Sequence, residues 1–183
     1  MSAGAIANFD IEVTVPCTAW IDACPGAETF SSHAARQALA GALPLTPIPL
    51  GTRLAVGIRL TDENEQRRLN RAYRGKDAPT NVLAFPLAHL ADPLPPGSPL
   101  LLGDIVLALE TVRREAEAQG KLLPDHLRHL VVHGVLHLLG FDHDSEPEAA
   151  AMEAREVEIL GALGVPDPYG DTILNREPDH FSR

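Results

Sequence analysis

The sequence predicts a single α+β domain in which about five helices pack on one mixed sheet of roughly four strands. Strand-like and helix-like segments follow one another along the chain without an internal repeat. The 183 residues suit one hydrophobic core, and with aromatic residues at only 4% we expect that core to be mainly aliphatic. We assign residues 1–170 to this domain and expect 171–183, which have little apolar pattern, to be a flexible tail.

Two strands and two helices are expected in the first part of the chain. Residues 11–15 alternate apolar and polar side chains, which predicts a strand, and 54–60 show the same alternation more clearly. An alanine-rich stretch at 27–43 predicts a helix that ends before a proline. Asp62, with a glutamate three residues later, resembles a capping box and predicts a helix that continues to about residue 73.

Two more strands and three more helices are expected in the second part. The strands are short apolar runs at 82–85 and 101–107, and the proline-rich segment 87–99 between them predicts an irregular loop. Each later helix ends near a glycine, which readily adopts the left-handed conformation that closes helices. These helices are expected at 110–119, 124–139 and 145–163.

Composition excludes several classes of protein. A net charge of -10 argues against non-specific coating of nucleic acid, because phosphate favours a basic partner, although a local basic surface stays possible. Cys17 and Cys24 are too few for a disulfide framework and are not spaced for a metal knuckle, so we expect reduced thiols. We find no signal-peptide pattern and no apolar run long enough to span a membrane, and we expect a cytoplasmic protein.

Three histidines, His133, His137 and His143, form the clearest chemical motif. Residues four apart lie on one face of a helix, so the first two can present their imidazoles to one point. Gly140 can end the helix and turn the chain so that His143 returns to the same point. Three imidazoles with an open fourth position are typical of catalytic zinc, and we predict one Zn²⁺ per chain on this helix and the turn after it.

The neighbouring histidines are interpreted more simply. Three ordinary histidines at the edge of a buried helix are the alternative to a metal site, but the intervening glycine favours the metal. His129 also lies four residues before His133, and we interpret it as a polar neighbour of the site. His126 has no partner in the pattern and is expected at the surface. Nickel or copper would also suit three imidazoles.

The histidine spacing matches that of metzincin proteases except at one position. Those enzymes have a water-activating glutamate directly after the first histidine, where this chain has Gly134. Glycine cannot act as a base, so proteolysis of that kind is disfavoured although the metal ligands are shared. The general base therefore stays unidentified from the sequence.

A second group of residues suits phosphate binding. Residues 59–76 carry six basic and three acidic side chains, whereas 142–158 carry one basic and seven acidic ones. Arg74 begins a polar loop that leads into a strand, so we predict a catalytic role for it, with Arg71 and Lys76 as weaker phosphate contacts. For Arg71, a solvated helix face explains the pattern equally well. Asp104, in an otherwise apolar strand, is either a satisfied polar residue or a hydrogen-bond partner of a ligand histidine.

Taken together, these motifs resemble the YbeY family of bacterial metal-dependent endoribonucleases. The resemblance rests on the segments YRGKD at 73–77, PTNVL at 79–83, HLVVHG at 129–134, LHLLG at 136–140 and DPY at 167–169, together with Asp142 and His143. Ala84 stands where the family usually has serine, and Phe141 where it commonly has tyrosine. The proline-rich loop is expected to be longer than is usual in the family, which leaves local substrate contacts open.

The resemblance implies that His133, His137 and His143 bind zinc, that Arg74 is the functional arginine, and that single-stranded RNA is the substrate. It further implies roles in 16S rRNA 3′-end maturation, ribosome biogenesis and ribosome quality control. The implied partners are the small ribosomal subunit, a small-subunit ribosomal protein and an assembly GTPase. Two alternatives stay open: a zinc peptidase or amidase, favoured by the histidine spacing alone, and a non-catalytic ribosome-assembly factor that binds RNA.

Overall fold

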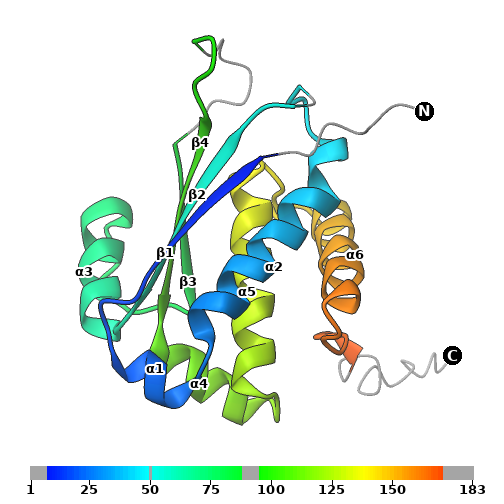
Figure 1. Cartoon of the computed structure of the whole chain (residues 1–183). Helices are drawn as coiled ribbons and strands as arrows, with labels where there is room; N and C mark the ends of the chain where they lie inside the picture. Colours follow the sequence, from blue (N-terminus) through cyan, green and yellow to red (C-terminus); the bar gives the residue numbers. More distant parts are fainter. Residues whose placement is uncertain (1–7, 50, 88–94, 171–183) are drawn as a thin grey trace, which may run out of the picture.

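The predicted α+β fold is confirmed by the computed structural model, which describes residues 8–49, 51–87 and 95–170. Four strands form one sheet in the order β1-β2-β4-β3, in which β1, β2 and β4 are parallel and β3 runs antiparallel to β4 (Figure 1). The strands are β1 (Phe9–Thr14), β2 (Leu54–Thr61), β3 (Val82–Pro86) and β4 (Leu100–Ala108). All four lie where the apolar patterns predicted them, within a few residues.

Six α-helices are present in the described residues, one more than expected. They are α1 (Ala19–Ala23), α2 (Ala27–Ala42), α3 (Glu63–Arg74), α4 (Leu109–Ala118), α5 (Leu123–Leu138) and α6 (Glu146–Ala162), and a 3-10 turn at Leu43–Leu45 follows α2. The additional helix, α1, buries Trp20, whose indole nitrogen donates a hydrogen bond to the carbonyl oxygen of Thr61 at 2.9 Å. Its five residues are too few to show a helical period in the sequence.

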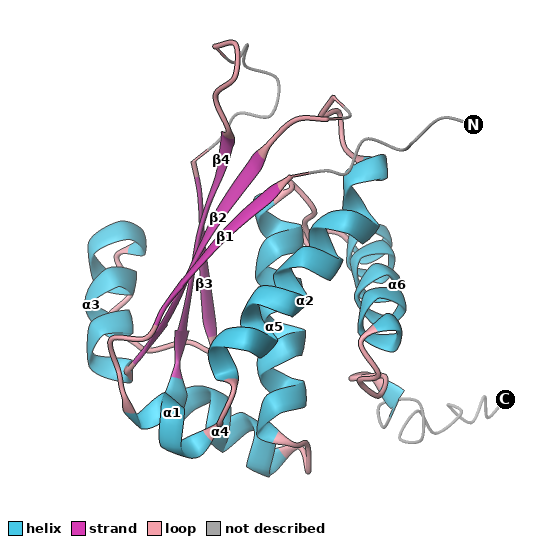
Figure 2. Cartoon of the chain, in the orientation of Figure 1, coloured by secondary structure: helices cyan, strands magenta, loops and turns pink. Residues whose placement is uncertain are grey.

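The helices cover the two faces of the sheet unequally (Figure 2). α2 and α5 pack side by side on one face, and α6 packs on the outside of these two helices. α3 lies on the opposite face, and it leaves part of that face uncovered by helices. The central layer of α5 and α2 is therefore enclosed by the sheet on one side and by α6 on the other.

Helix α5 approaches the sheet closely because it has a glycine at the contact. A Cβ atom added at Gly134 would lie 2.9 Å from Cγ2 of Ile105 in β4, closer than carbon atoms approach without strain. Val131, Val135 and Leu138 of the same helix are buried around this contact. The glycine thus sets how near α5 lies to the sheet.

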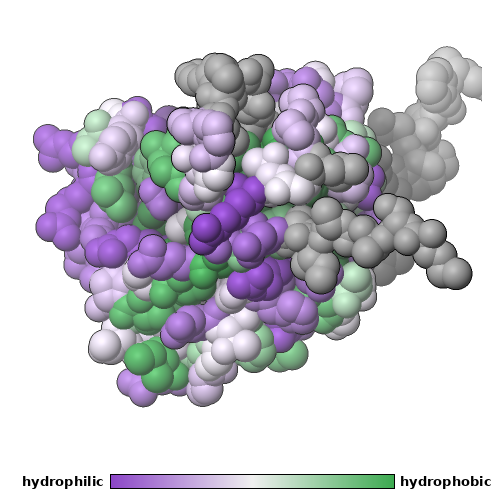
Figure 3. Space-filling view, turned by 45° about the horizontal axis from the view of Figure 1, so that its top comes forward, coloured by the Kyte–Doolittle hydropathy of each residue, from purple (hydrophilic) through white to green (hydrophobic). Residues whose placement is uncertain are grey.

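On the face seen in Figure 3, patches of hydrophobic side chains lie among hydrophilic ones. No helix in the described ranges is long and apolar enough to cross a membrane. The predicted loop at 87–99 is without helix or strand where it is described, but 88–94 lie outside the described residues. The predicted tail, 171–183, also lies outside them.

Candidate metal centre

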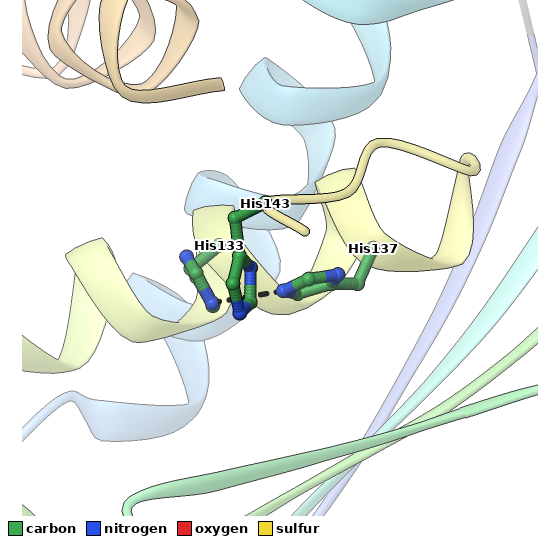
Figure 4. Close-up of side chains that lie close together, drawn as sticks. All are labelled: His133, His137 and His143. Carbon is green, nitrogen blue, oxygen red and sulfur yellow. Dashed lines mark hydrogen bonds between the residues drawn. The ribbon is translucent and has the colours of Figure 1, made fainter. Parts of the chain in front are cut away.

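The structure brings His133, His137 and His143 together at one point (Figure 4). One ring nitrogen from each residue lies within 4.8 Å of the other two. The Nε2 atoms of His133 and His137 are 3.0 Å apart, as expected for imidazoles one turn apart on the same face of α5. The two rings are nearly perpendicular, with an interplanar angle of 77°.

The return of His143 depends on the turn that ends α5. Gly140 has φ of +90°, in the left-handed region that the sequence analysis assigned to it. Its amide donates to the carbonyl oxygen of His137 at 3.0 Å, and the amide of Phe141 donates to that of Leu136 at 3.0 Å. This pair of hydrogen bonds is a Schellman motif, which satisfies the last carbonyl groups of the helix and reverses the chain.

The cluster is enclosed on one side and open on the other. His133 and His137 are half-buried, whereas His143 is exposed. Burial lowers the pKa of His137, and the neighbouring His133 and His143 lower it further. A neutral imidazole is the form that binds a metal, so this environment favours the ligand state.

A buried carboxylate holds the second nitrogen of His133. Oε1 of Glu156, in α6, lies 2.5 Å from Nδ1 of His133, and the glutamate side chain is fully buried. With the Nδ1 proton donated to this carboxylate, the lone pair of Nε2 faces the other two histidines. Metal-ligating histidines usually have such a partner on their second nitrogen.

Glu156 also joins two further side chains to the site. Its Oε2 accepts hydrogen bonds from Nε2 of His129, at 2.9 Å, and from the hydroxyl of Tyr169. Burial raises the pKa of Glu156, but the hydrogen bonds from His129, His133 and Tyr169 outweigh it and lower the pKa to about 2. Burial and the hydrogen bond to Glu156 raise the pKa of Tyr169, so its hydroxyl keeps its proton.

The donor set fits a tetrahedral transition metal. In a zinc site with Zn–N bonds of about 2.0–2.1 Å, ligand nitrogens lie about 3.3 Å apart. The 3.0 Å between the Nε2 atoms of His133 and His137 is close to this spacing. Three imidazoles, one of them oriented by a carboxylate, would leave a tetrahedral ion one position for water or substrate. His133, His137 and His143 are thus the residues that could hold one metal ion.

A small polar pocket of about 370 Å³ is lined in part by His133, and His137 and His143 are not among its lining residues. Its lining includes Asn81, Glu115, Lys121 and Tyr169. The carboxylate of Glu115 accepts hydrogen bonds from the side-chain amide of Asn81, the nearer at 3.0 Å. The pocket is therefore lined by polar groups that already bind one another.

Arg74 lies in a different place from the histidines. It occupies a groove of about 680 Å³ between α3 and the uncovered face of the sheet, which we call the α3 groove. None of the three histidines is among the residues that line this groove. The Arg74 guanidinium donates a hydrogen bond to the carbonyl oxygen of Ala84 at 3.1 Å, so it rests against the edge strand β3. α5 also contacts β3, which places this strand between the two groups.

The weaker phosphate candidates are exposed on the same side as Arg74. Arg71 lines a separate surface groove with Arg67, Arg68 and Asp77, and Lys76 lies in the loop after α3. Nε of Arg67 is paired with Asp77 at 2.7 Å. The structure therefore gathers basic side chains along α3 but leaves them in solvent.

Asp104 requires a correction, because the structure does not place it beside a ligand histidine. Its neighbour Ile105 faces Gly134 of α5, and consecutive strand residues point to opposite faces. Asp104 is exposed, lies over Gly57 on the uncovered face of the sheet and lines the α3 groove. The carboxylate that contacts His133 is Glu156 instead.

His126 also differs from the expectation. It is 3% exposed rather than at the surface, and its Nε2 lies 2.9 Å from the carboxylate of Glu115. Burial lowers its pKa, so the ring is neutral. His129, interpreted from the sequence as a polar neighbour of the site, does contact Glu156.

Glu156 is the site residue that the sequence analysis missed. It lies in a strongly acidic segment, where a glutamate is usually a solvated surface residue. One signal was present: it stands four residues after Met152 and before Leu160, both buried, so it falls on the apolar stripe of α6. A charged residue on such a stripe indicates a buried partner.

Comparison with known proteins gives consistent results. A family model described as Endoribonuclease YbeY matches residues 27–164. The chain is 52% identical over 167 residues to an Endoribonuclease YbeY of Paramagnetospirillum magneticum, covering 90% of this chain and 98% of that one. It is 50% identical over 157 residues to the Rhodospirillum rubrum protein of the same name, covering 83% and 77%. The solution structure of TM1509 from Thermotoga maritima matches with a TM-score of 0.53 and 21% identity, over 96% and 99% of the two chains, and shows a similar fold.

Proposed function

The chain belongs to the endoribonuclease YbeY family, and from this premise we propose that it is a metal-dependent endoribonuclease that cuts single-stranded RNA. The metal dependence is supported by the convergence of three imidazoles, of which that of His133 contacts a buried carboxylate. We take zinc as the metal, because three neutral nitrogen ligands and an open position suit it.

A zinc ion held by His133, His137 and His143 would supply Lewis-acid chemistry, either for a phosphate oxygen or for a water molecule. The chain contributes the setting for that chemistry. His143 lies on the exposed side of the cluster, where a phosphodiester can approach. Gly134 carries no proton acceptor at the position where metzincin peptidases have their base, so the base is not supplied from that turn of α5.

The basic residues of α3 are proposed to hold the RNA backbone. Arg74 has the planar donor fork that suits phosphate, and it would stabilise charge on the substrate beside β3. Arg71 and Lys76 would add weaker contacts to neighbouring phosphates. An RNA strand that crosses the edge of β3 would meet both this basic side and the histidine cluster, because α5 and Arg74 both contact that strand.

The cellular role follows from the family and is proposed as 16S rRNA 3′-end maturation, with contributions to ribosome biogenesis and quality control. The partners would be the small ribosomal subunit, one of its proteins and an assembly GTPase. These roles would place the protein in the cytoplasm.

The test compares unstructured RNA with casein as substrates of the purified, metal-loaded protein. We expect cleavage of RNA alone, loss of cleavage when a chelator removes the metal, and recovery when Zn²⁺ is added back. The variant His143→Ala, prepared in the same way, should bind no metal and cut no RNA, which controls for contaminating nuclease. Cleavage of casein alone would instead indicate a peptidase. RNA binding without any metal-dependent cleavage would indicate an assembly factor.

A further inference from the structure

We propose that Glu156 is a positioning residue of the metal centre, whose buried carboxylate fixes the orientation and tautomer of His133 for metal binding. The inference rests on the proposed metal-dependent function and adds to it a residue that belongs to a different helix from the ligands. It also predicts that metal affinity depends on groups that never touch the metal.

Glu156 is buried at a cost in free energy. A buried carboxylate is strongly unfavourable unless it is paired and hydrogen-bonded. Glu156 is fully buried on α6 between Met152 and Leu160. A leucine or methionine at position 156 would fill the same space without that cost. Its three hydrogen-bond partners are two imidazoles and a phenol, none of which carries a permanent charge. A buried charge with such partners indicates a role beyond packing.

His133 is held in one direction by contacts at both ring nitrogens. Its Nδ1 lies 2.5 Å from Oε1 of Glu156, while its Nε2 lies 3.0 Å from Nε2 of His137. Only the tautomer with the proton on Nδ1 satisfies the carboxylate and leaves a lone pair on Nε2. Without Glu156, the ring could place its proton on Nε2 or rotate away, and the ligand would be lost for part of the time.

The Glu156 carboxylate is itself held in place by two other side chains. Nε2 of His129 binds Oε2 of Glu156 at 2.9 Å, and the hydroxyl of Tyr169 binds the same oxygen. Tyr169 is anchored in turn, because its amide donates to Asp167 at 2.8 Å and Lys121 donates to the carbonyl oxygen of Pro168 at 2.9 Å. The turn after α6 thus fixes the carboxylate, and the carboxylate fixes the ligand.

The experiment measures the Kd for Zn²⁺ by competition with a chromophoric chelator, on the full-length chain. We expect Glu156→Gln, which keeps the size of the side chain and removes its charge, to bind Zn²⁺ about 10- to 100-fold more weakly than the wild type. The matched control is Glu158→Gln, which makes the same change at an exposed position of the same helix, 69% accessible and paired with Arg155. The control should bind Zn²⁺ as the wild type does.

Two further measurements separate positioning from a general structural role. The visible spectrum of the Co²⁺-loaded protein reports ligand geometry, and it should change in Glu156→Gln but not in Glu158→Gln. Glu156→Asp retains the charge and should recover part of the affinity. Should Glu156→Gln not fold, Tyr169→Phe decides, because it removes one hydrogen bond from the carboxylate and should weaken Zn²⁺ binding by a smaller factor.

The outcomes are distinct from those that test the function. Folded Glu156→Gln or Tyr169→Phe binding Zn²⁺ as tightly as the wild type would overturn the positioning role and leave the endoribonuclease proposal intact. A wild-type chain that binds no metal would overturn the metal-dependent function itself.

Discussion

The histidine cluster on α5 and the α3 groove lie on opposite faces of the same sheet, and they differ in how their side chains are held. His133 contacts a fully buried carboxylate, and that carboxylate contacts two further side chains. Arg74 is exposed, and its one hydrogen bond among the described residues is to a backbone carbonyl of β3. The first region is organised before any ligand arrives, whereas the second can move to meet one.

The two regions therefore suit different ligands. A metal ion demands fixed distances and angles, so its ligands need support from surrounding side chains. A flexible RNA backbone tolerates variation in the position of a cation, and long basic side chains in solvent can follow it. We therefore expect substitutions on α5 to change metal content and substitutions on α3 to change RNA cleavage alone.

The largest expected effect is that of His137→Ala. Removing one of three ligands should reduce bound zinc from about one ion per chain to none detectable by elemental analysis, and should abolish RNA cleavage. His33→Ala, at an exposed histidine of α2, is the control and should retain both. Full metal content in His137→Ala would show that the histidine cluster is not the metal site.

Arg74→Ala should separate the two regions. Losing a cationic donor that stabilises the transition state typically costs about 100- to 1000-fold in rate, so we expect a loss of this order in RNA cleavage with metal content unchanged. Arg113→Ala, which removes an exposed arginine of α4, is the matched control for the loss of one charge. Equal cleavage by both variants would remove Arg74 from the proposed mechanism.

Gly134→Ala tests whether the close packing of α5 on the sheet tolerates a larger residue at this contact. The added methyl group would meet Cγ2 of Ile105 at 2.9 Å, and such overpacking costs about 1–3 kcal/mol. Chemical denaturation of the metal-free protein should show this loss. Gly161→Ala is the control, because a Cβ atom at that α6 position has nothing within 4 Å. An unchanged free energy of unfolding in Gly134→Ala would show that the helix can move away without cost.

The smallest expected effect is that of Ser145→Ala at the start of α6, the helix that carries Glu156. Ser145 and Glu148 form a reciprocal capping box, and loss of such a cap costs about 1 kcal/mol. Thermal unfolding should show this decrease, while Ser98→Ala, at an exposed turn position, should leave the melting temperature unchanged. A large loss of zinc affinity in Ser145→Ala would show that the site depends on the helix end as well as on Glu156.

Local patterns explain which parts of the structure were predictable. Alternation located β2, and the spacing of His133 and Gly140 located the cluster, because these patterns depend only on residues close together in the chain. The sheet order and the face on which Asp104 lies depend on pairing between distant strands, and alternation does not say which face is covered. Glu156 was missed for the same reason, since its two histidine partners are 23 and 27 residues away.

The position of His143 beyond the turn has a thermodynamic consequence. A ligand that follows Gly140 is joined to α5 only through the turn, so a metal ion shared by His137 and His143 would act as a cross-link over the C-terminal end of the helix. Binding energy would then be transmitted into the local opening equilibrium of that segment. The metal would then order the turn that carries His143, and the measured metal affinity would include the free energy of ordering that turn.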